Sequence, residues 1–298
     1  MRAIAPARGG PRGATLSVRM ALRSAHVLAL LALGCSDGRA EPGAGTAVRA
    51  DLAPRTKAAQ DVAREPFTPP DSRGWGRAAG LDYLERTIGG GDPAVPMPML
   101  IMIHGLGDRP RHDWFGGADA IDTPLRLIMP QAPTPYGQDG FAWFPFRARG
   151  NDPDDLARGI SAAADRLARA ITVLKTQRPT RGAPIVAGFS QGGMLSYALA
   201  LRHPELVSFS HPISGLLPEP LWPSKRADSA APSIAAMHGD ADDLVPIEDD
   251  RRLQAHLRKL GHDAQLREFP GVGHTITPAM EAHSVELLNA AARRLVPR

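Results

Sequence analysis

The segment Gly188-Phe189-Ser190-Gln191-Gly192-Gly193 indicates the architecture of this chain. A short apolar run, 184–187, precedes it, and a helix-like segment, 194–202, follows it. A strand, a sharp turn that carries a serine, and a helix are the setting of the G-x-S-x-G nucleophile elbow. The flanking glycines have a steric reason, because strand and helix approach so closely at such a turn that a Cβ atom would collide. Ser190 is therefore predicted to project at a helix N-terminus, where free N–H groups favour developing negative charge.

A serine hydroxyl is a weak nucleophile at neutral pH, so it needs a base and an acid that orients the base. In proteins built around this elbow the base comes last in chain order. The last strand-like segment is broken by two glycines and leads to His274, the candidate general base. Three acids, Asp240, Asp242 and Asp243, follow an earlier strand-like segment. We choose Asp242, because Asp240 follows a glycine and is expected to shape the turn, while Asp243 is expected to face solvent.

An oxyanion site needs two N–H groups, one from the residue after the nucleophile and one from an early strand-to-helix loop. Gln191 supplies the first through its backbone. The second is expected after the apolar segment 99–103, in the sequence His104-Gly105-Leu106-Gly107-Asp108. Leu106 lies between two glycines, whose backbone freedom lets its N–H turn toward a pocket. His104 is expected to brace this loop by hydrogen bonds.

Strand-like and helix-like segments alternate along the chain, which predicts an α/β fold with a mainly parallel central sheet flanked by helices. In such sheets, sites lie beyond the C-terminal ends of the strands, and the candidate residues all follow strand ends. The expected strands are 81–88, 99–103, 125–129, 185–188, 206–213, 233–237 and 264–269. The expected helices are 154–177, the elbow helix 194–202, 247–260 and 278–294.

Six motifs occur in an order and spacing that match a known family. They are His104–Asp108, Met129–Pro133, Trp143–Phe144, Gly188–Gly193, His238–Asp242 with Val245–Pro246, and Gly273–His274. Over roughly residues 80–295 the chain resembles the phospholipase/carboxylesterase family, which is similar to acyl-protein thioesterases and small bacterial carboxylesterases with the α/β-hydrolase fold. The resemblance implies that Ser190, Asp242 and His274 are a catalytic triad, with Leu106 and Gln191 as oxyanion donors.

One departure from the family concerns the substrate-binding loop. The family usually has an acidic residue after the Trp143–Phe144 pair, and this chain has Pro145. The proline-rich stretch 119–141 is expected to run as an irregular loop after its strand, ending in this aromatic cluster. Trp143 and Phe144 are predicted to form a substrate-binding pocket wall; the alternative is ordinary packing of the loop against the core.

The N-terminus predicts export. Residues 1–34 hold five arginines and no acid, and an apolar run, 25–33, follows the basic part. This is the pattern of a secretory signal peptide, and the apolar run is too short to span a bilayer. Cys35, the only cysteine, lies where a bacterial lipoprotein leader would be cut and lipidated. The alternatives are secretion without lipid and a buried cysteine in an uncleaved protein; Met20 is an alternative start.

Residues 35–78 are rich in alanine, glycine and proline and are expected to form a flexible tether, with the catalytic domain at 79–298. The whole chain has 35 basic and 31 acidic residues. Without the five leader arginines, 30 basic residues face 31 acidic ones, so the basic character belongs to the leader. No basic patch argues for nucleic acid.

These patterns predict an exported enzyme, either a cell-envelope lipoprotein or a periplasmic or secreted protein, that contacts a membrane only through its lipid anchor. The expected substrates are small-molecule carboxylic esters, or thioesters; a feruloyl-type or polyester-fragment esterase is the alternative. A catalytically silent binding protein on the same scaffold is a second class. The sequence has no metal-binding spacing and no dinucleotide fingerprint, so neither a metal nor a cofactor is expected. No oligomeric state is predicted.

Overall fold

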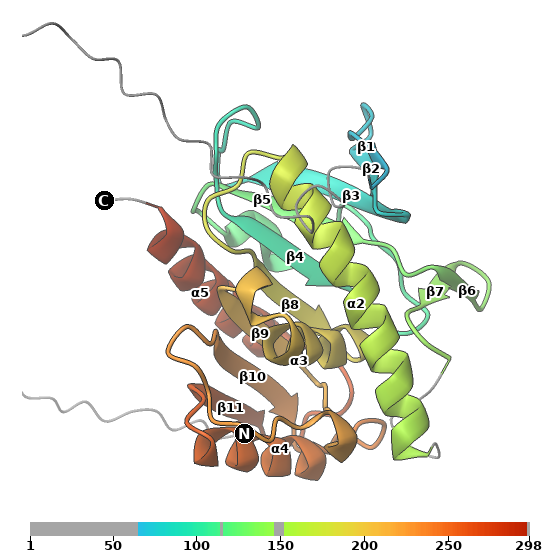
Figure 1. Cartoon of the computed structure of the whole chain (residues 1–298), viewed down its shortest axis with the longest axis vertical. Helices are drawn as coiled ribbons and strands as arrows, with labels where there is room; N and C mark the ends of the chain where they lie inside the picture. The colour runs from blue at the N-terminus through green and yellow to red at the C-terminus, as the bar shows by residue number, and fades with distance from the viewer. Residues whose placement is uncertain (1–64, 114–115, 146–151, 297–298) are drawn as a thin grey trace, which may run out of the picture. The chain divides into compact units, whose positions relative to one another are not determined.

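A nine-stranded sheet forms the centre of this computed structural model, which describes residues 65–113, 116–145 and 152–296 (Figure 1). The strand order is β1-β2-β3-β5-β4-β8-β9-β10-β11. Neighbouring strands are antiparallel from β1 to β5 and parallel from β5 to β11. The strands are β1 (Phe67–Thr68), β2 (Trp75–Ala78), β3 (Leu81–Ile88), β4 (Met99–Ile103), β5 (Leu125–Pro130), β8 (Ile185–Phe189), β9 (Phe209–Ile213), β10 (Ser233–Gly239) and β11 (Ala264–Phe269).

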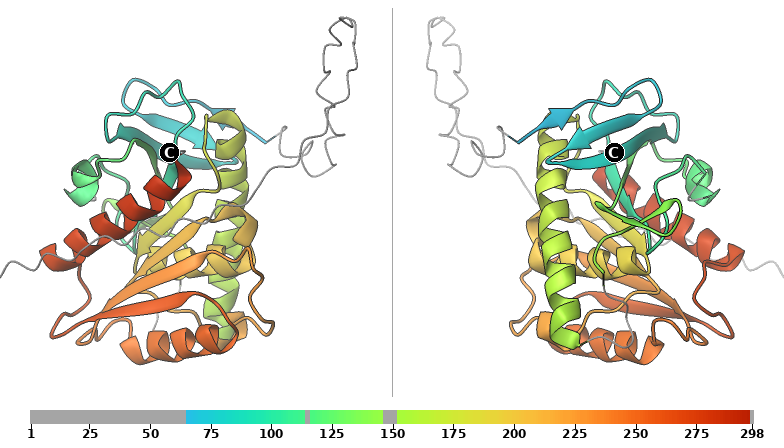
Figure 2. Two further views of the ribbon diagram at one scale, coloured as in Figure 1. Left: turned by 90° about the vertical axis from the view of Figure 1, so that its left-hand side faces the viewer. Right: turned by 90° about the vertical axis from the view of Figure 1, so that its right-hand side faces the viewer.

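Helices cover both faces of the sheet. On one face lie α2 (Pro153–Gln177), α3 (Gln191–Arg202) and α4 (Ile247–Lys259), and on the other lies α5 (Pro278–Leu295) (Figures 1 and 2). The long helix α2 is stabilised at its start by Asp152, whose side chain accepts a hydrogen bond of 2.8 Å from the Asp154 N–H. Its buried residues recur at helical spacing and form one apolar stripe toward the sheet.

The central strand β4 shows how the sheet holds two cores apart. All five of its residues are buried, as expected for a strand covered on both sides. Met99, Ile101 and Ile103 belong to the core under α2 and α3. Leu100 and Met102 point to the opposite face and belong to the core under α5. The expected α/β fold with a mainly parallel sheet is confirmed.

Two element boundaries differ from the sequence-based expectation. The strand β9 begins at Phe209, because residues Pro204–Leu206 form a 3-10 turn that starts at a proline. The elbow helix α3 begins directly at Gln191, so that the tight turn occupies Ser190 alone.

The expected tether is wrong at its C-terminal end, because residues 67–68 and 75–78 form the strands β1 and β2. The strand β2 is joined to β3 by a tight turn in which Ala79 and Gly80 both have positive φ. Gly76 fits because a Cβ there would lie 2.6 Å from the Tyr83 ring and hydroxyl. Pro69 and Pro70, which suggested a linker, lie between β1 and β2, where no ladder hydrogen bond needs their missing N–H.

The expected irregular loop within 119–141 is also wrong in part. It contains a two-stranded hairpin of β6 (Thr134–Tyr136) and β7 (Gly140–Ala142) after β5, and a 3-10 turn, η1 (Gly116–Ala120), before it. Gly137 in the hairpin turn has a φ of 67°, a conformation that glycine adopts without strain.

The leader 1–34, Cys35 and the tether up to residue 64 lie outside the described residues. Among the helices that the structure does describe, none combines the length and apolar character needed to cross a bilayer.

Candidate active site

Ser190 occupies a strained turn between β8 and α3. Its backbone has φ 56° and ψ −117°, which is a conformation that non-glycine residues avoid. The turn is held by a hydrogen bond of 2.9 Å from the Ser190 N–H to the Ile213 carbonyl on β9. Because the strain is retained at a packed position, the serine side chain is fixed relative to the sheet rather than free to relax.

The glycines of this turn are required by contact distances. A Cβ on Gly188 would lie 2.5 Å from the backbone of Gly192, and one on Gly192 would lie 2.0 Å from the Ile103 carbonyl oxygen. Both distances are below any contact that real Cβ atoms make. The predicted steric role of these glycines is therefore confirmed, and α3 starts in direct contact with the end of β4.

His274 lies on the loop after β11 and faces the serine. Its Nε2 atom is 2.9 Å from Ser190 Oγ, and its Nδ1 atom is 2.7 Å from Asp242 Oδ2. The ring packs against Phe189 with centroids 4.8 Å apart. The loop that carries His274 packs directly against the end of β10, since a Cβ on Gly239 would lie 2.1 Å from the Val272 carbonyl oxygen. The structure thus brings the predicted nucleophile, base and acid together from three separate strand ends.

Asp242 is the acid that contacts His274. Its side chain is completely buried, and its second oxygen, Oδ1, accepts hydrogen bonds from the N–H groups of Leu244 at 3.0 Å and Val245 at 2.8 Å. Burial alone would raise its pKa, but hydrogen bonds from His238, His274 and Val245 hold the pKa far below its ordinary value. Asp242 is therefore an anion at neutral pH.

The two other candidate acids have the placements that the sequence predicted for them. Asp240 is exposed and accepts a hydrogen bond of 2.6 Å from the Gly271 N–H, which closes the turn next to the histidine loop. Asp243 is exposed to solvent.

The segment 104–108, which carries Leu106, is held beside the serine. Its Gly105 lies so close that an added Cβ would be 3.2 Å from Ser190 Cβ. His104 is buried and braces the segment from within: Nε2 accepts a hydrogen bond of 3.1 Å from the Ala132 N–H, so Nδ1 carries the proton and donates to the Gly105 carbonyl at 2.7 Å. Burial lowers the pKa of His104, which keeps the ring neutral in this role.

The hairpin β6–β7 holds the same segment from outside. The Gly107 N–H donates to the Phe141 carbonyl at 2.9 Å, and the Phe141 N–H donates to the Asp108 carbonyl at 3.0 Å. A Cβ on Gly140 would lie 2.0 Å from the Gly107 carbonyl oxygen, so the two backbones touch. Leu106 is thus fixed through its neighbours on both sides.

Trp143 and Phe144 lie in the hydrophobic core, with 5% and 3% of their surfaces exposed. The Trp143 indole N–H donates to the His104 carbonyl at 3.0 Å, and its ring packs on the His104 ring with centroids 5.4 Å apart. In this structure the two side chains therefore pack against the core, because the tryptophan surface is buried and its indole N–H already has an acceptor. Contact with substrate stays a prediction.

The side chain of Gln191 has a role that the sequence analysis missed. Its Oε1 accepts a hydrogen bond of 3.0 Å from the Trp143 N–H, and its Nε2 donates to the Phe144 carbonyl at 2.9 Å. The amide therefore braces the bend at residues 143–145, where the N–H of one residue and the carbonyl of the next turn to the same side. A glutamine at a fully buried helix start was the available signal, since a buried amide needs partners of this kind.

His238 is a second missed residue. It lies at the end of β10, is completely buried, and its Nε2 atom is 3.3 Å from Asp242 Oδ2. The signal in the sequence was its place four residues before Asp242 at a strand end, where a polar side chain must find a buried partner.

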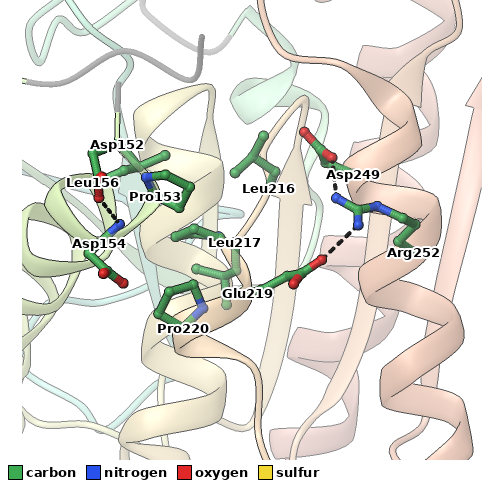
Figure 3. Close-up of a pocket in the computed structure, with 11 residues that line it drawn as sticks. Asp152, Pro153, Asp154, Leu156, Leu216, Leu217, Glu219, Pro220, Asp249 and Arg252 are labelled. Carbon is green, nitrogen blue, oxygen red and sulfur yellow. Dashed lines mark hydrogen bonds and ion pairs between the residues drawn. The ribbon is translucent and has the colours of Figure 1, made fainter. Parts of the chain in front are cut away.

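A cavity of about 560 Å³ opens between the start of α2 and the segment that follows β9 (Figure 3). Three almost fully buried leucines, Leu156, Leu216 and Leu217, line its floor, and Pro153 and Pro220 are its exposed apolar residues. Arg252 bridges Glu219 and Asp249 on the side of α4, and none of the triad residues lines the cavity. This segment is anchored at the elbow helix, since a Cβ on Gly215 would lie 2.6 Å from the backbone of Gly193. The cavity therefore adjoins the first turn of the elbow helix. Across residues 65–113, 116–145 and 152–296, no group of histidine, cysteine and acidic side chains has a metal-binding arrangement.

A parallel sheet with a serine on a strained strand-to-helix turn defines the class of α/β-hydrolase folds. The chain belongs to the phospholipase/carboxylesterase family, whose pattern matches residues 89–289. It is 27% identical over 204 residues to acyl-protein thioesterase 1 of Gibberella zeae, covering 60% of this chain and 84% of the relative. It is accordingly a hydrolase that acts on ester bonds.

Two solved structures share the fold. The crystal structure of esterase PE8 is 26% identical, superposes with a TM-score of 0.56, and the match covers 69% of this chain and 96% of the esterase. Acyl-protein thioesterase 2 of Zea mays shares the fold at 23% identity and a TM-score of 0.55, with 70% of this chain and 98% of the plant protein covered.

Proposed function

We propose that this protein is a serine carboxylesterase in which Ser190, His274 and Asp242 are the catalytic triad. The observation that carries the proposal is the continuous chain of hydrogen bonds from Ser190 Oγ through both nitrogens of His274 to Asp242 Oδ2. This is the arrangement in which an imidazole can remove the serine proton while a carboxylate holds the other nitrogen.

The first step forms an acyl-enzyme. Ser190 Oγ attacks the carbonyl carbon of the ester as its proton passes to His274 Nε2, and the carbonyl oxygen becomes an oxyanion. The Leu106 and Gln191 N–H groups are proposed to receive this charge, and loss of one such donor costs roughly 3 kcal/mol in the barrier. His274 then gives the proton to the departing alcohol or thiol.

The second step releases the acid. Water takes the place of the alcohol, His274 removes its proton, and the hydroxide attacks the acyl carbon, so that Ser190 leaves with the proton returned from His274. Asp242 stays ionised throughout because its pKa is held low, and it keeps the Nδ1 proton on the side away from the serine. The imidazolium that forms in each step is stabilised by this buried negative charge.

The substrate class follows from the site together with the expected export. We propose small-molecule carboxylic esters with small or medium acyl chains, because an exported enzyme cannot reach acyl proteins of the cytosol. From the predicted leader and Cys35 we propose that the enzyme resides in the cell envelope as a lipoprotein, or in the periplasm or medium.

The decisive test is labelling with a fluorophosphonate probe, which reacts only with an activated serine. Wild-type protein is expected to be labelled at Ser190 and to hydrolyse p-nitrophenyl esters. The Ser190→Ala variant is expected to lose labelling and to lose turnover by a factor on the order of 10⁵, with an unchanged unfolding temperature. A wild-type protein that folds but is not labelled would establish the silent binding protein instead.

A substrate panel then defines the ester. It runs from p-nitrophenyl acetate to palmitate, with feruloyl esters and an acyl thioester beside it. The highest kcat/KM is expected for a short or medium acyl chain. A preference for the feruloyl ester would replace this assignment with the feruloyl-type alternative.

A further inference from the structure

Behind Asp242 lies a second buried histidine that takes no part in the mechanism above. His238 Nε2 is 2.9 Å from the Val245 carbonyl oxygen and 3.3 Å from Asp242 Oδ2. A carbonyl and a carboxylate can only accept hydrogen bonds, so Nε2 must carry a proton. That one N–H therefore faces both ends of the turn 242–245, which presents the carboxylate to His274.

The other nitrogen of His238 is fixed by a buried chain of polar groups. Its Nδ1 atom is 3.0 Å from Asp250 Oδ2 on α4. Asp250 Oδ1 accepts from the Tyr197 hydroxyl at 2.5 Å, and that hydroxyl accepts from Gln254 Nε2 at 2.6 Å. All of these side chains are buried. Because Gln254 donates to the tyrosine oxygen, the Tyr197 hydroxyl must give its own proton to Asp250. The hydrogen bonds therefore all run from Gln254 toward Asp250.

His238 Nε2 carries a proton whether His238 is neutral or charged. Burial lowers the pKa of His238, but hydrogen bonds with Asp242 and Asp250 outweigh it and raise the pKa to about 9. Burial raises the pKa of Asp250. The pair holds one proton at neutral pH on Nδ1 or on Asp250, and it is uncharged as a whole either way. The remaining ionisable group opposite His238 is Glu268 on β11, which is paired with Arg251.

We propose that His238 is a positioning residue for hydrolysis: its Nε2–H holds Asp242 and the turn 242–245 so that Oδ2 faces His274. Asp250, Tyr197 and Gln254 lock the ring in the orientation that makes this possible. The inference rests on the proposed function of Asp242 and adds a layer behind the triad.

This role has a consequence for the pH profile. A donor on Asp242 draws electron density away from the carboxylate and makes the Asp242–His274 pair less basic as a unit. The pair then stays ready to accept the serine proton at lower pH. Losing the donor makes the pair hold a proton more tightly, so the acid limb of kcat/KM moves to higher pH.

The test uses two double variants that leave no buried charge unpaired. His238→Met with Asp250→Asn removes the donor, and His238→Gln with Asp250→Asn keeps an amide N–H that reaches the position of Nε2. The matched control is His211→Gln on the neighbouring strand β9. His211 is also completely buried and makes two hydrogen bonds, to Ala235 and Ser284, away from the triad.

We expect the methionine variant to lose about tenfold in kcat, which corresponds to one hydrogen bond to a charged group. Its acid limb should rise by roughly half a pH unit or more, with KM within about twofold of wild type. The glutamine variant should recover most of both changes. The control should keep the wild-type limb even if its unfolding temperature falls.

Two results would overturn the inference. One is a folded methionine variant with wild-type kcat and acid limb. The other is a loss of kcat that follows the unfolding temperature in all three variants, with no shift of the limb. Failure of the proposed function would look different, because wild-type protein would then not react with fluorophosphonate at Ser190.

Discussion

Two clusters of buried charge lie in different parts of the sheet, and only in one of them do all the ionisable side chains have hydrogen-bond partners at every polar atom. Around Asp242, the side chains of His238, His274, Asp250 and Tyr197 all have partners. Where β3 and β5 pair and α2 ends, one Glu85 oxygen binds both Arg126 and Arg178. In that second cluster Glu85 Oε2, Arg126 Nε and Arg178 Nε find no hydrogen-bond partner within the described ranges.

Buried charge has a different role in the Glu85 cluster and in the Asp242 cluster. In the Glu85 cluster two cations share one anion, so the charges tie β3, β5 and the end of α2 together and serve the fold. In the Asp242 cluster every polar atom of the ionisable side chains has a hydrogen-bond partner, and the contacts lead from Asp242 through His274 to Ser190 Oγ. Pairing every ionisable group in this way fixes the direction of each proton, which is what proton transfer requires.

The largest effect is expected when the Asp242 cluster is broken at its centre. Asp242→Asn should lower kcat by a factor on the order of 10⁴, because the amide stabilises the wrong tautomer of His274. Steady-state rates on a p-nitrophenyl ester measure this. Asp243→Asn, one position along and exposed, is the control and should retain wild-type kcat. Equal losses in the two variants would show that Asp242 is not the orienting acid.

A smaller effect, on stability rather than rate, is expected in the Glu85 cluster. Glu85→Gln leaves the fully buried guanidinium of Arg126 and the partly exposed one of Arg178 without an anion, and it should lower the free energy of unfolding by about 3 kcal/mol. Arg126→Met leaves the balanced Glu85–Arg178 pair, and it should change stability by less than about half of that amount. Urea denaturation distinguishes the two.

A purely structural role of the Glu85 cluster would be contradicted if Glu85→Gln moved the pH profile of kcat/KM in the folded enzyme. It would also be contradicted if Arg126→Met lowered the free energy of unfolding more than Glu85→Gln does, since the second cation would then be needed for folding.

The smallest effect is a pH dependence of stability that comes from the Asp242 cluster. The pKa of His238 is raised in the folded protein from 6.5 to about 9, so its stabilisation is complete below pH 6.5 and is lost as the pH rises through 9. The free energy of unfolding should therefore decline between pH 6.5 and 9. His238→Gln with Asp250→Asn should decline less over this interval, and an identical slope in chemical denaturation would contradict the assignment.

The sequence predicted the mainly parallel sheet and the four helices, because local patterns set them. It also predicted that Ser190, Asp242 and His274 meet, because each follows the C-terminal end of a strand, and these ends lie at one edge of a parallel sheet. Strand alternation, helical spacing and the glycines of the elbow all act within a few residues. The choice of Asp242 over Asp240 rested on turn geometry, and the structure has Asp240 in that turn.

What sequence reasoning could not predict depends on contacts between distant segments. The strand β2 became part of the sheet through pairing with β3, although its neighbourhood reads as a linker. No local pattern predicted that the Trp143 indole N–H donates to the carbonyl of His104, 39 residues earlier in the chain. The pairing of His238 with Asp250 on α4 also joins distant segments, and no local pattern predicts it.

The hairpin β6–β7 grips the segment around Leu106 through main-chain atoms, while the residues of β6 are exposed. Substitutions at Thr134 or Pro135 can therefore change the surface of the hairpin without altering the main-chain bonds that hold the segment. Under the proposed oxyanion role of Leu106, the strand β6 is thus a region in which directed evolution can vary side chains while the position of the oxyanion donor is kept.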